Sequence, residues 1–118
     1  MILLTLPLPP SINTYWGFHG NRRFLTKKAN EFKELAKIAV KEANCPNYYE
    51  QRLCISIYLH FADKRKADID NRIKSLLDAL VQTKMLFNDD SQVDELHVFR
   101  GENIKGGMCK IIIDVIEV

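Results

Sequence analysis

The segment RLCISIYLHF, residues 52–61, alternates large apolar side chains with smaller or more polar ones. The apolar positions are Leu53, Ile55, Ile57, Leu59 and Phe61. Because successive side chains of a β-strand point to opposite faces of its sheet, this period of two predicts a strand with one buried face. Further along, apolar residues recur at helical spacing at Ile73, Leu76, Leu77 and Leu80. This spacing predicts a helix over about 69–83 that packs on the buried face of a sheet.

The remaining elements extend this layered arrangement. ILLTLPLPPS predicts a short strand that ends at its prolines, which donate no backbone hydrogen bond. SINTYWGFHGNRRF is expected to be a loop, and a first helix is predicted from the N-cap Thr26 until Asn44. VDELHVFR and MCKIIIDVIEV predict two strands joined as a hairpin around Gly106 and Gly107. The order predicts an α/β (α+β) fold with a mixed sheet of about four strands and two main helices.

Size and composition predict one domain, 1–118. With 118 residues, of which 47% are hydrophobic, the chain can bury a core without disulfides or metal. The net charge of +2 is too small to indicate nucleic-acid binding by itself. Cys45, Cys54 and Cys109 are far apart and form no C-x-x-C pair, which favours buried thiols in a reducing cytoplasm over a zinc site. No apolar run approaches the roughly 20 residues that cross a bilayer, so no membrane contact is expected.

The segment KRKADIDNRIKSLLDAL, residues 64–80, places Asp68 and Asp70 directly before the second predicted helix. If the chain is still extended there, both carboxylates point to one side. Two anions so close repel each other unless a proton, a cation or separation relieves the repulsion. Mg²⁺ prefers oxygen ligands and is usually held by one or two carboxylates, so the pair predicts a magnesium site.

Other charged residues can join this pair. Asp89 and Asp90 offer a third carboxylate if the chain turns back after the helix. Lys74 follows Asp70 by one helical turn on the same flank, and Asp78 continues the row, where it pairs with Lys74 or faces solvent. A lone aspartate at a helix start is usually a cap, and a basic run is usually solvated surface. Their combination favours metal-assisted phosphoryl chemistry on a polyanion.

These segments resemble the RusA family of Holliday-junction resolvases, small phage- and prophage-associated endonucleases of bacteria. The resemblance covers nearly the whole chain: LPLPPSINTYW, where the family has a Pro-Pro-Ser-x-Asn element, the basic run before DIDNRIKSLLDAL, and LFNDDSQVDEL. It implies a RusA-like fold and a homodimer that resolves four-way DNA in recombination and repair. It also implies paired nicks made with Mg²⁺, in the cytoplasm of a bacterium or of a phage-infected cell.

The resemblance further implies the roles of individual residues. Asp68, Asp70 and Asp90 correspond to the catalytic, metal-binding carboxylates, and Lys74 corresponds to the essential lysine. Asp89 is an ambiguous neighbour, and Asp90 is preferred because the second member of the pair aligns with the catalytic residue of the family.

Cations and aromatic residues near this site are expected to contact DNA. Ala67 stands where the family often continues an arginine run, so phosphate contacts are also expected from the loop and the first helix. The expected DNA-binding residues are Lys64, Arg65, Lys66, Asn71, Arg22, Arg23, Lys27 and Tyr15. The aromatic residues Tyr15, Trp16 and Phe18 are expected to stack on or brace distorted bases at the branch point. For Trp16 and Phe18 there is an alternative, in which they pack over the core edge or form the dimer contact.

Two other classes of protein fit part of the pattern. A junction-binding protein without cleavage activity would have the same fold, although the intact set of aspartates and lysine argues against it. A phosphoacceptor receiver domain also uses an acidic pair, an aspartate and a lysine. That fold alternates parallel strands and helices regularly, which the expected C-terminal hairpin does not fit.

Overall fold

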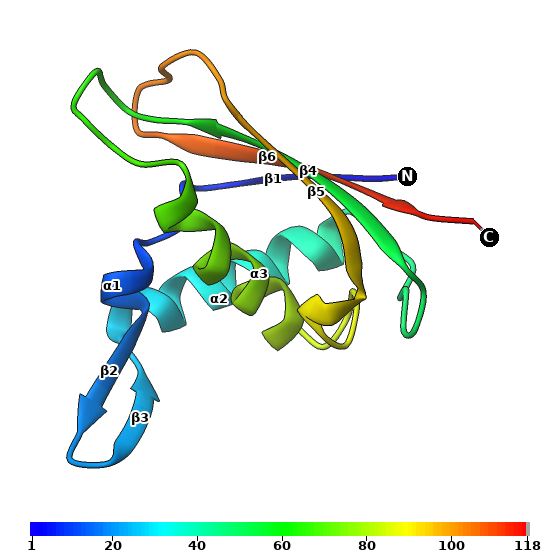
Figure 1. Cartoon of the computed structure of the whole chain (residues 1–118), viewed down its shortest axis with the longest axis horizontal. Coiled ribbons are helices and arrows are strands. Elements are labelled where there is room, and N and C mark those ends of the chain that lie inside the picture. The colour runs from blue at the N-terminus through cyan, green and yellow to red at the C-terminus, as the bar shows by residue number, and fades with distance from the viewer. Residues whose placement is uncertain (118) are drawn as a thin grey trace.

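A computed structural model of the chain describes residues 1–117 and shows a mixed sheet with helices on one face (Figure 1). The strand order of this four-stranded sheet is β1-β6-β4-β5. The strands are β1 (Ile2–Leu6), β4 (Leu53–His60), β5 (Val93–Arg100) and β6 (Met108–Val115). The main helices are α2 (Lys27–Glu42) and α3 (Ile73–Gln82). The predicted fold class is therefore confirmed, whereas the single domain over 1–118 stays a prediction, with Val118 outside the described residues.

The core lies between this sheet and the two helices. The alternation in β4 buries Leu53, Ile55, Ile57 and Leu59 completely on the helix side. From α3, Leu76 and Leu80 meet them without exposed surface. Burying one such side chain contributes about 1.5–3 kcal/mol. No helix or strand among residues 1–117 covers the other face of the sheet in Figure 1.

The strands β5 and β6 do not form the predicted hairpin. The strand β4 lies between them, parallel to β5 and antiparallel to β6. Gly106 and Gly107 do adopt positive φ angles of 84° and 73°, so the turn was located correctly. The turn belongs to a connection that crosses the end of β4, where Gly101 N donates to Leu59 O at 2.8 Å. Because β6 lies between β1 and β4, it has hydrogen-bonding partners on both sides, whereas an edge strand leaves one row of N–H and C=O groups unpaired.

The segment expected to be a loop before α2 is partly structured. It contains the short helix α1 (Ile12–Tyr15) and an antiparallel hairpin of β2 (Trp16–His19) and β3 (Arg22–Leu25). In Figure 1 this hairpin projects away from the body of the domain. A Cβ added at Gly17 would lie 2.5 Å from the Phe24 ring, so the glycine makes room for the aromatic side chain of the opposite strand. The pattern was missed because no apolar alternation marks these strands.

Two further expectations concern helix ends and membranes. Thr26 is the N-cap of α2, as predicted, and its Oγ1 accepts a hydrogen bond from Ala29 N at 3.3 Å. The helix ends at Glu42, and Asn44 has a positive φ of 50°.

Within residues 1–117, no helix has the length and the apolar character that crossing a bilayer requires.

Candidate active site

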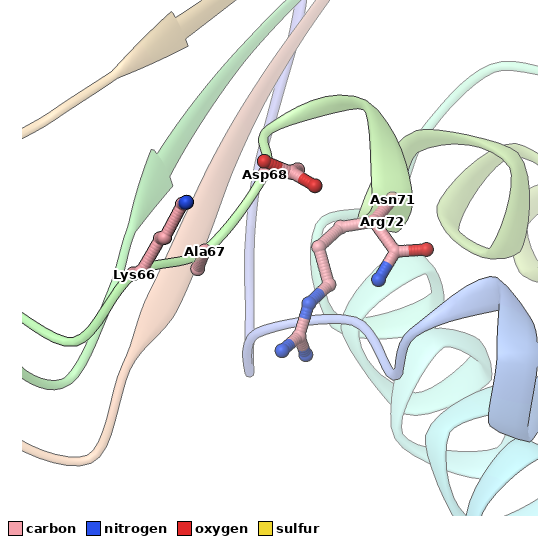
Figure 2. Close-up of a pocket in the computed structure, with 5 residues that line it drawn as sticks. All are labelled: Lys66, Ala67, Asp68, Asn71 and Arg72. Carbon is pink, nitrogen blue, oxygen red and sulfur yellow. The ribbon is translucent and has the colours of Figure 1, made fainter.

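The loop that follows β4 carries the first two predicted carboxylates. Figure 2 shows Asp68 in a hollow that it shares with Lys66, Ala67, Asn71 and Arg72. This hollow lies where the loop enters the 3-10 helix η1 (Asp70–Arg72), which continues into α3. Both Asp68 and Asp70 are exposed, and neither side chain has a hydrogen bond or ion pair within residues 1–117. Two carboxylates without a protein partner are available to a cation.

The backbone at Asp68 and Asp70 differs from the expected one. Ile69 has φ −67° and ψ −36°, which are helical values. The prediction of an extended segment, which would put both carboxylates on one side, is therefore wrong. The reason is local, because Ile69 is the N-cap of η1 and the chain turns before Asp70.

Hydrogen bonds lock the start of α3 onto the proline element near the N-terminus. Arg72 Nη1 donates to Pro9 O at 2.7 Å, and Ser75 Oγ donates to Pro10 O at 2.5 Å. Asn71 Nδ2 donates to Ser11 Oγ at 2.8 Å. Prolines cannot donate but their carbonyls accept, so two motifs 60 or more positions apart form one structure. The side-chain amide of Asn71, which was expected to contact DNA, therefore makes a hydrogen bond within the protein.

Lys74 and Asp90, which the family resemblance assigns to one site, lie in direct contact in the structure. Lys74 Nζ lies 2.5 Å from Asp90 Oδ2 and 3.0 Å from Asp78 Oδ1. The bond to Asp90, followed by the bond to Asp78, raises the pKa of Lys74 and keeps its ammonium charged. Asp78 Oδ2 also accepts a hydrogen bond from Trp16 Nε1 at 3.3 Å, which connects the projecting hairpin to this lysine.

The two neighbouring aspartates before β5 have different partners. Asp89 is the N-cap of the 3-10 helix η2 (Asp90–Gln92), and its Oδ2 accepts a hydrogen bond from Ser91 N at 3.1 Å. Hydrogen bonding to Ser91, first through its side chain and second through its backbone N–H, is the main reason that the pKa of Asp89 lies below its ordinary value. Asp90 follows as the first residue of η2 and meets Lys74. The geometry supports Asp90 as the functional member of the pair.

Gln92 is a positioning residue that the sequence analysis missed. Its side chain is buried, its Oε1 accepts from the backbone N–H groups of Asn88 and Asp89, and its Nε2 donates to the carbonyls of Tyr48 and Gln51. One amide therefore fixes the loop that presents Asp90. The spacing D-x-x-Q of a capping box was the available signal.

The three predicted metal ligands do not form one group in this structure. Within residues 1–117, a single set of three or more potential ligands has its ligand atoms within 4.8 Å of one another, and it contains Cys54, Glu95 and His97. Asp68, Asp70 and Asp90 do not form such a set, and Asp90 has Lys74 as its cation. The shared metal site of the three aspartates stays a prediction.

The cations that are expected to contact DNA are exposed, and they lie on two separate parts of the structure. Lys64, Arg65 and Lys66 are exposed on the loop after β4, where Arg65 pairs with Asp63 at 2.8 Å. Exposed positions are also found for the three cations of the hairpin and the first helix, Arg22, Arg23 and Lys27.

The expectation that Tyr15 contacts DNA is wrong. Its side chain has no exposed surface, and its hydroxyl donates to Gln82 Oε1 at 2.7 Å. A ring that is enclosed by the core cannot stack on a base. Trp16 is half-buried, with the Arg23 guanidinium 3.6 Å above its ring, whereas Phe18 is 70% exposed at the hairpin. Burial thus excludes base stacking by Tyr15, whereas base stacking and a dimer contact both stay predictions for Phe18.

Exposed carboxylates, a lysine held between aspartates and a cationic loop define a site suited to hydrolysis of a phosphodiester. The family model of Endodeoxyribonuclease RusA matches residues 7–116, and the chain belongs to this family, whose members are nucleases that hydrolyse phosphodiester bonds in DNA. This chain is similar in sequence to several proteins named crossover junction endodeoxyribonuclease RusA. That of Enterobacteria phage HK97 is 32% identical over 95% of this chain and 92% of its own length. The proteins of Shigella sonnei and of Escherichia coli strain K12 are each 29% identical over 93% of this chain and 91% of theirs.

Replacing Asp78 tests whether its contact with Lys74 matters for cleavage. We expect Asp78→Asn to lower cleavage of DNA about tenfold, because outer partners of a site commonly contribute that much, and to leave DNA affinity unchanged. Trp16→Phe is the matched control, since it removes the indole N–H but leaves the Lys74–Asp78 contact of 3.0 Å. Single-turnover rates together with binding isotherms measure both effects. Equal rates for Asp78→Asn and wild type would remove Asp78 from the site.

Proposed function

We propose that this protein is a Mg²⁺-dependent endonuclease that resolves Holliday junctions, four-way DNA, by paired phosphodiester cleavage as a homodimer. We further propose that it acts in recombination and repair in the cytoplasm of a bacterium or of a phage-infected cell. The observation that carries the proposal is the contact of 2.5 Å between Lys74 and Asp90 in a chain of the RusA family, together with two unpartnered aspartates at the start of the same helix.

The carboxylates fit Mg²⁺ by their chemistry. Asp68 and Asp70 offer oxygen ligands on an exposed turn, and magnesium usually keeps several waters and takes only one or two protein carboxylates. We propose Asp68 and Asp70 as ligands, with Asp90 as the third. When bound, the ion would polarise the scissile phosphate and activate water for attack.

Lys74 has two tasks in this proposal. Its ammonium holds the Asp90 carboxylate in position, because the carboxylate accepts a bond of 2.5 Å from it. During cleavage, negative charge grows on the phosphate oxygens, and a cation already held in place stabilises that charge without reorganisation. Asp78 fixes Lys74 from the other side at 3.0 Å.

Cations beside Asp68 suit the binding of a phosphate group. Lys66 and Arg72 line the same hollow as Asp68 (Figure 2). Arg72 is anchored to Pro9 O at 2.7 Å, so its guanidinium has a defined position. Two such sites related by the twofold axis of a homodimer would face the two strands that a four-way junction presents symmetrically.

Incubation with labelled DNA tests the whole proposal. We expect the protein with Mg²⁺ to make symmetric paired nicks in a four-way junction and to leave a linear duplex with the same arm sequences intact. Without Mg²⁺ the protein should bind the junction but not cut it. Binding without cleavage at every Mg²⁺ concentration would show a junction-binding protein instead, and equal cutting of the duplex would refute selectivity for the junction.

The salt dependence of binding should separate the cations of the loop. Arg65 is paired with Asp63 at 2.8 Å, whereas Lys64 and Lys66 have no ion pair within residues 1–117. We expect Lys64→Ala with Lys66→Ala to reduce the slope of log Kd against log salt by about 0.9 for each phosphate that these lysines neutralise. Arg65→Ala should reduce it less, because Asp63 already compensates this charge. Slopes equal to wild type in the double variant would place the loop away from DNA.

A further inference from the structure

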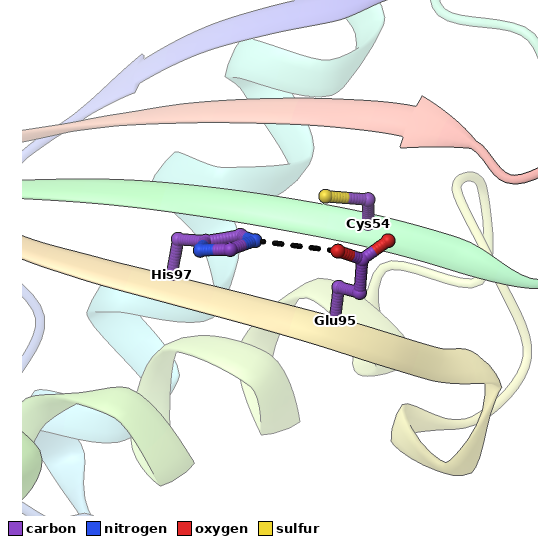
Figure 3. Close-up of side chains that lie close together, drawn as sticks. All are labelled: Cys54, Glu95 and His97. Carbon is purple, nitrogen blue, oxygen red and sulfur yellow. Dashed lines mark ion pairs between the residues drawn. The ribbon is translucent and has the colours of Figure 1, made fainter.

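A cluster of three different ligand types lies on the sheet face that the helices leave uncovered. Figure 3 shows Cys54 on β4 beside Glu95 and His97 on β5. The thiol sulfur, a carboxylate oxygen and an imidazole nitrogen all lie within 4.8 Å of one another. His97 Nε2 is 3.6 Å from Glu95 Oε1. These residues lie outside the set proposed for DNA cleavage.

An irregularity in the sheet places these side chains on one face. Leu53 pairs with Val93, but the next residue, Cys54, pairs with Glu95, so β5 contains one extra residue, Asp94. Since side chains alternate along a strand, this bulge turns Glu95 and His97 to the face of Cys54. Without it, Asp94 would be the residue opposite the thiol.

The bulge is held by a specific contact. The Arg52 guanidinium binds the Asp94 carboxylate through both Nε and Nη2, with Nε 3.0 Å from Oδ1. Arg52 Nη2 also donates to Ser91 O at 2.7 Å. The register that gathers the three ligands is therefore fixed by side-chain bonds to β5 and the turn before it.

The chemistry of the cluster differs from that of the aspartates. Thiolate, imidazole and carboxylate together are ligands of Zn²⁺, and three protein ligands with solvent in the fourth position is a common arrangement for that ion. Acidic side chains also surround the thiol, because Cys54 pairs with Glu95 on β5 and with Asp114 on β6. Their charge attracts a cation, whose binding would displace the thiol proton.

We propose that Cys54, Glu95 and His97 bind Zn²⁺ or a similar divalent transition-metal ion, in a site separate from that of Mg²⁺. The ion links β4 to β5, the parallel pair at the edge of the sheet. This proposal does not depend on the proposed nuclease function. It also revises the expectation for the cysteines, since Cys54 is only partly buried and gains its neighbours across strands rather than from nearby sequence.

Titration with Co²⁺, a spectroscopic substitute for Zn²⁺, tests the site directly. We expect one equivalent per chain, with a thiolate-to-cobalt charge-transfer band that added Zn²⁺ removes. Cys54→Ser should abolish the band, and His97→Gln should weaken binding by more than about tenfold, since losing even an outer partner of a metal costs as much. Cys45→Ser and Asp90→Asn are matched controls that should keep the band. No band in the wild type, or an undiminished band in Cys54→Ser, would overturn the proposal.

Thermal unfolding gives a second readout that is independent of cobalt. An ion that binds only the folded protein raises its Tm in a concentration-dependent manner. We therefore expect Zn²⁺ to raise the Tm of wild type and of Cys45→Ser, to raise that of His97→Gln only at higher Zn²⁺ concentration, and to leave that of Cys54→Ser unchanged. If Zn²⁺ shifts all four proteins equally, it binds elsewhere and the proposed site is refuted.

Discussion

Asp90→Asn is expected to lower the rate of junction cleavage by about 100-fold or more, the size typical for loss of one preorganised charge contact at a reaction centre. The change keeps the shape of the side chain but removes the carboxylate that Lys74 contacts at 2.5 Å. Junction affinity should remain close to wild type, and the free energy of unfolding should change by no more than about 1 kcal/mol, since the pair is partly exposed. Single-turnover cleavage and binding assays with the same junction measure the rate and the affinity, and urea unfolding measures the stability.

The neighbouring residue supplies the control for this prediction. Asp89 caps η2 through its bond of 3.1 Å to Ser91 N, and asparagine is an equally good N-cap. Asp89→Asn should therefore cleave at nearly the wild-type rate. If the rates were reversed, with Asp89→Asn inactive and Asp90→Asn active, the functional assignment would have to move to Asp89.

Gln92→Glu is expected to lower the free energy of unfolding by about 3–5 kcal/mol at neutral pH, because it buries an uncompensated charge. The side-chain amide donates to Tyr48 O and Gln51 O, each at 2.9 Å, and a carboxylate at the same place would face both carbonyls without a proton to donate. Burial raises the pKa of the introduced carboxyl. The loss should therefore shrink as the pH falls through that pKa and the group becomes neutral.

Gln82→Glu is the matched control for Gln92→Glu. Gln82 Oε1 only accepts a bond, from Tyr15 Oη at 2.7 Å, and a carboxylate accepts equally well. Urea unfolding at several pH values should show a small change for Gln82→Glu and a large, pH-dependent one for Gln92→Glu. Equal effects of the two substitutions would mean that the four bonds of Gln92 do not hold the loop.

Local patterns were sufficient for most elements of the fold. The alternation around Ile57 and the helical spacing around Leu76 each report which side of one element is buried, and both side chains are fully buried in the structure. Strand order is different, because a turn at Gly106 and Gly107 does not determine whether the strand that follows pairs with the previous one. Here β6 gains two partners by passing beyond β4, which is a property of the whole sheet.

The candidate site was predictable in part for a similar reason. The family resemblance implied that Lys74 and Asp90 belong to one site, and the two residues are in contact at 2.5 Å in the structure. Sequence spacing did not reveal that Asp89 is a cap or that Gln92 organises the loop, because both roles depend on backbone groups. The exposed position expected for Tyr15 failed because a neighbouring helix offered Gln82 as a partner for its hydroxyl.

The projecting hairpin is connected to Lys74 by a chain of side-chain contacts. Trp16 begins β2 and its indole holds Asp78, which in turn holds Lys74. A tilt of the hairpin relative to α3 would lengthen the bond of 3.3 Å between Trp16 and Asp78. The hairpin therefore reaches Lys74 through the single carboxylate of Asp78, which connects residues 62 positions apart in the sequence to one ammonium group.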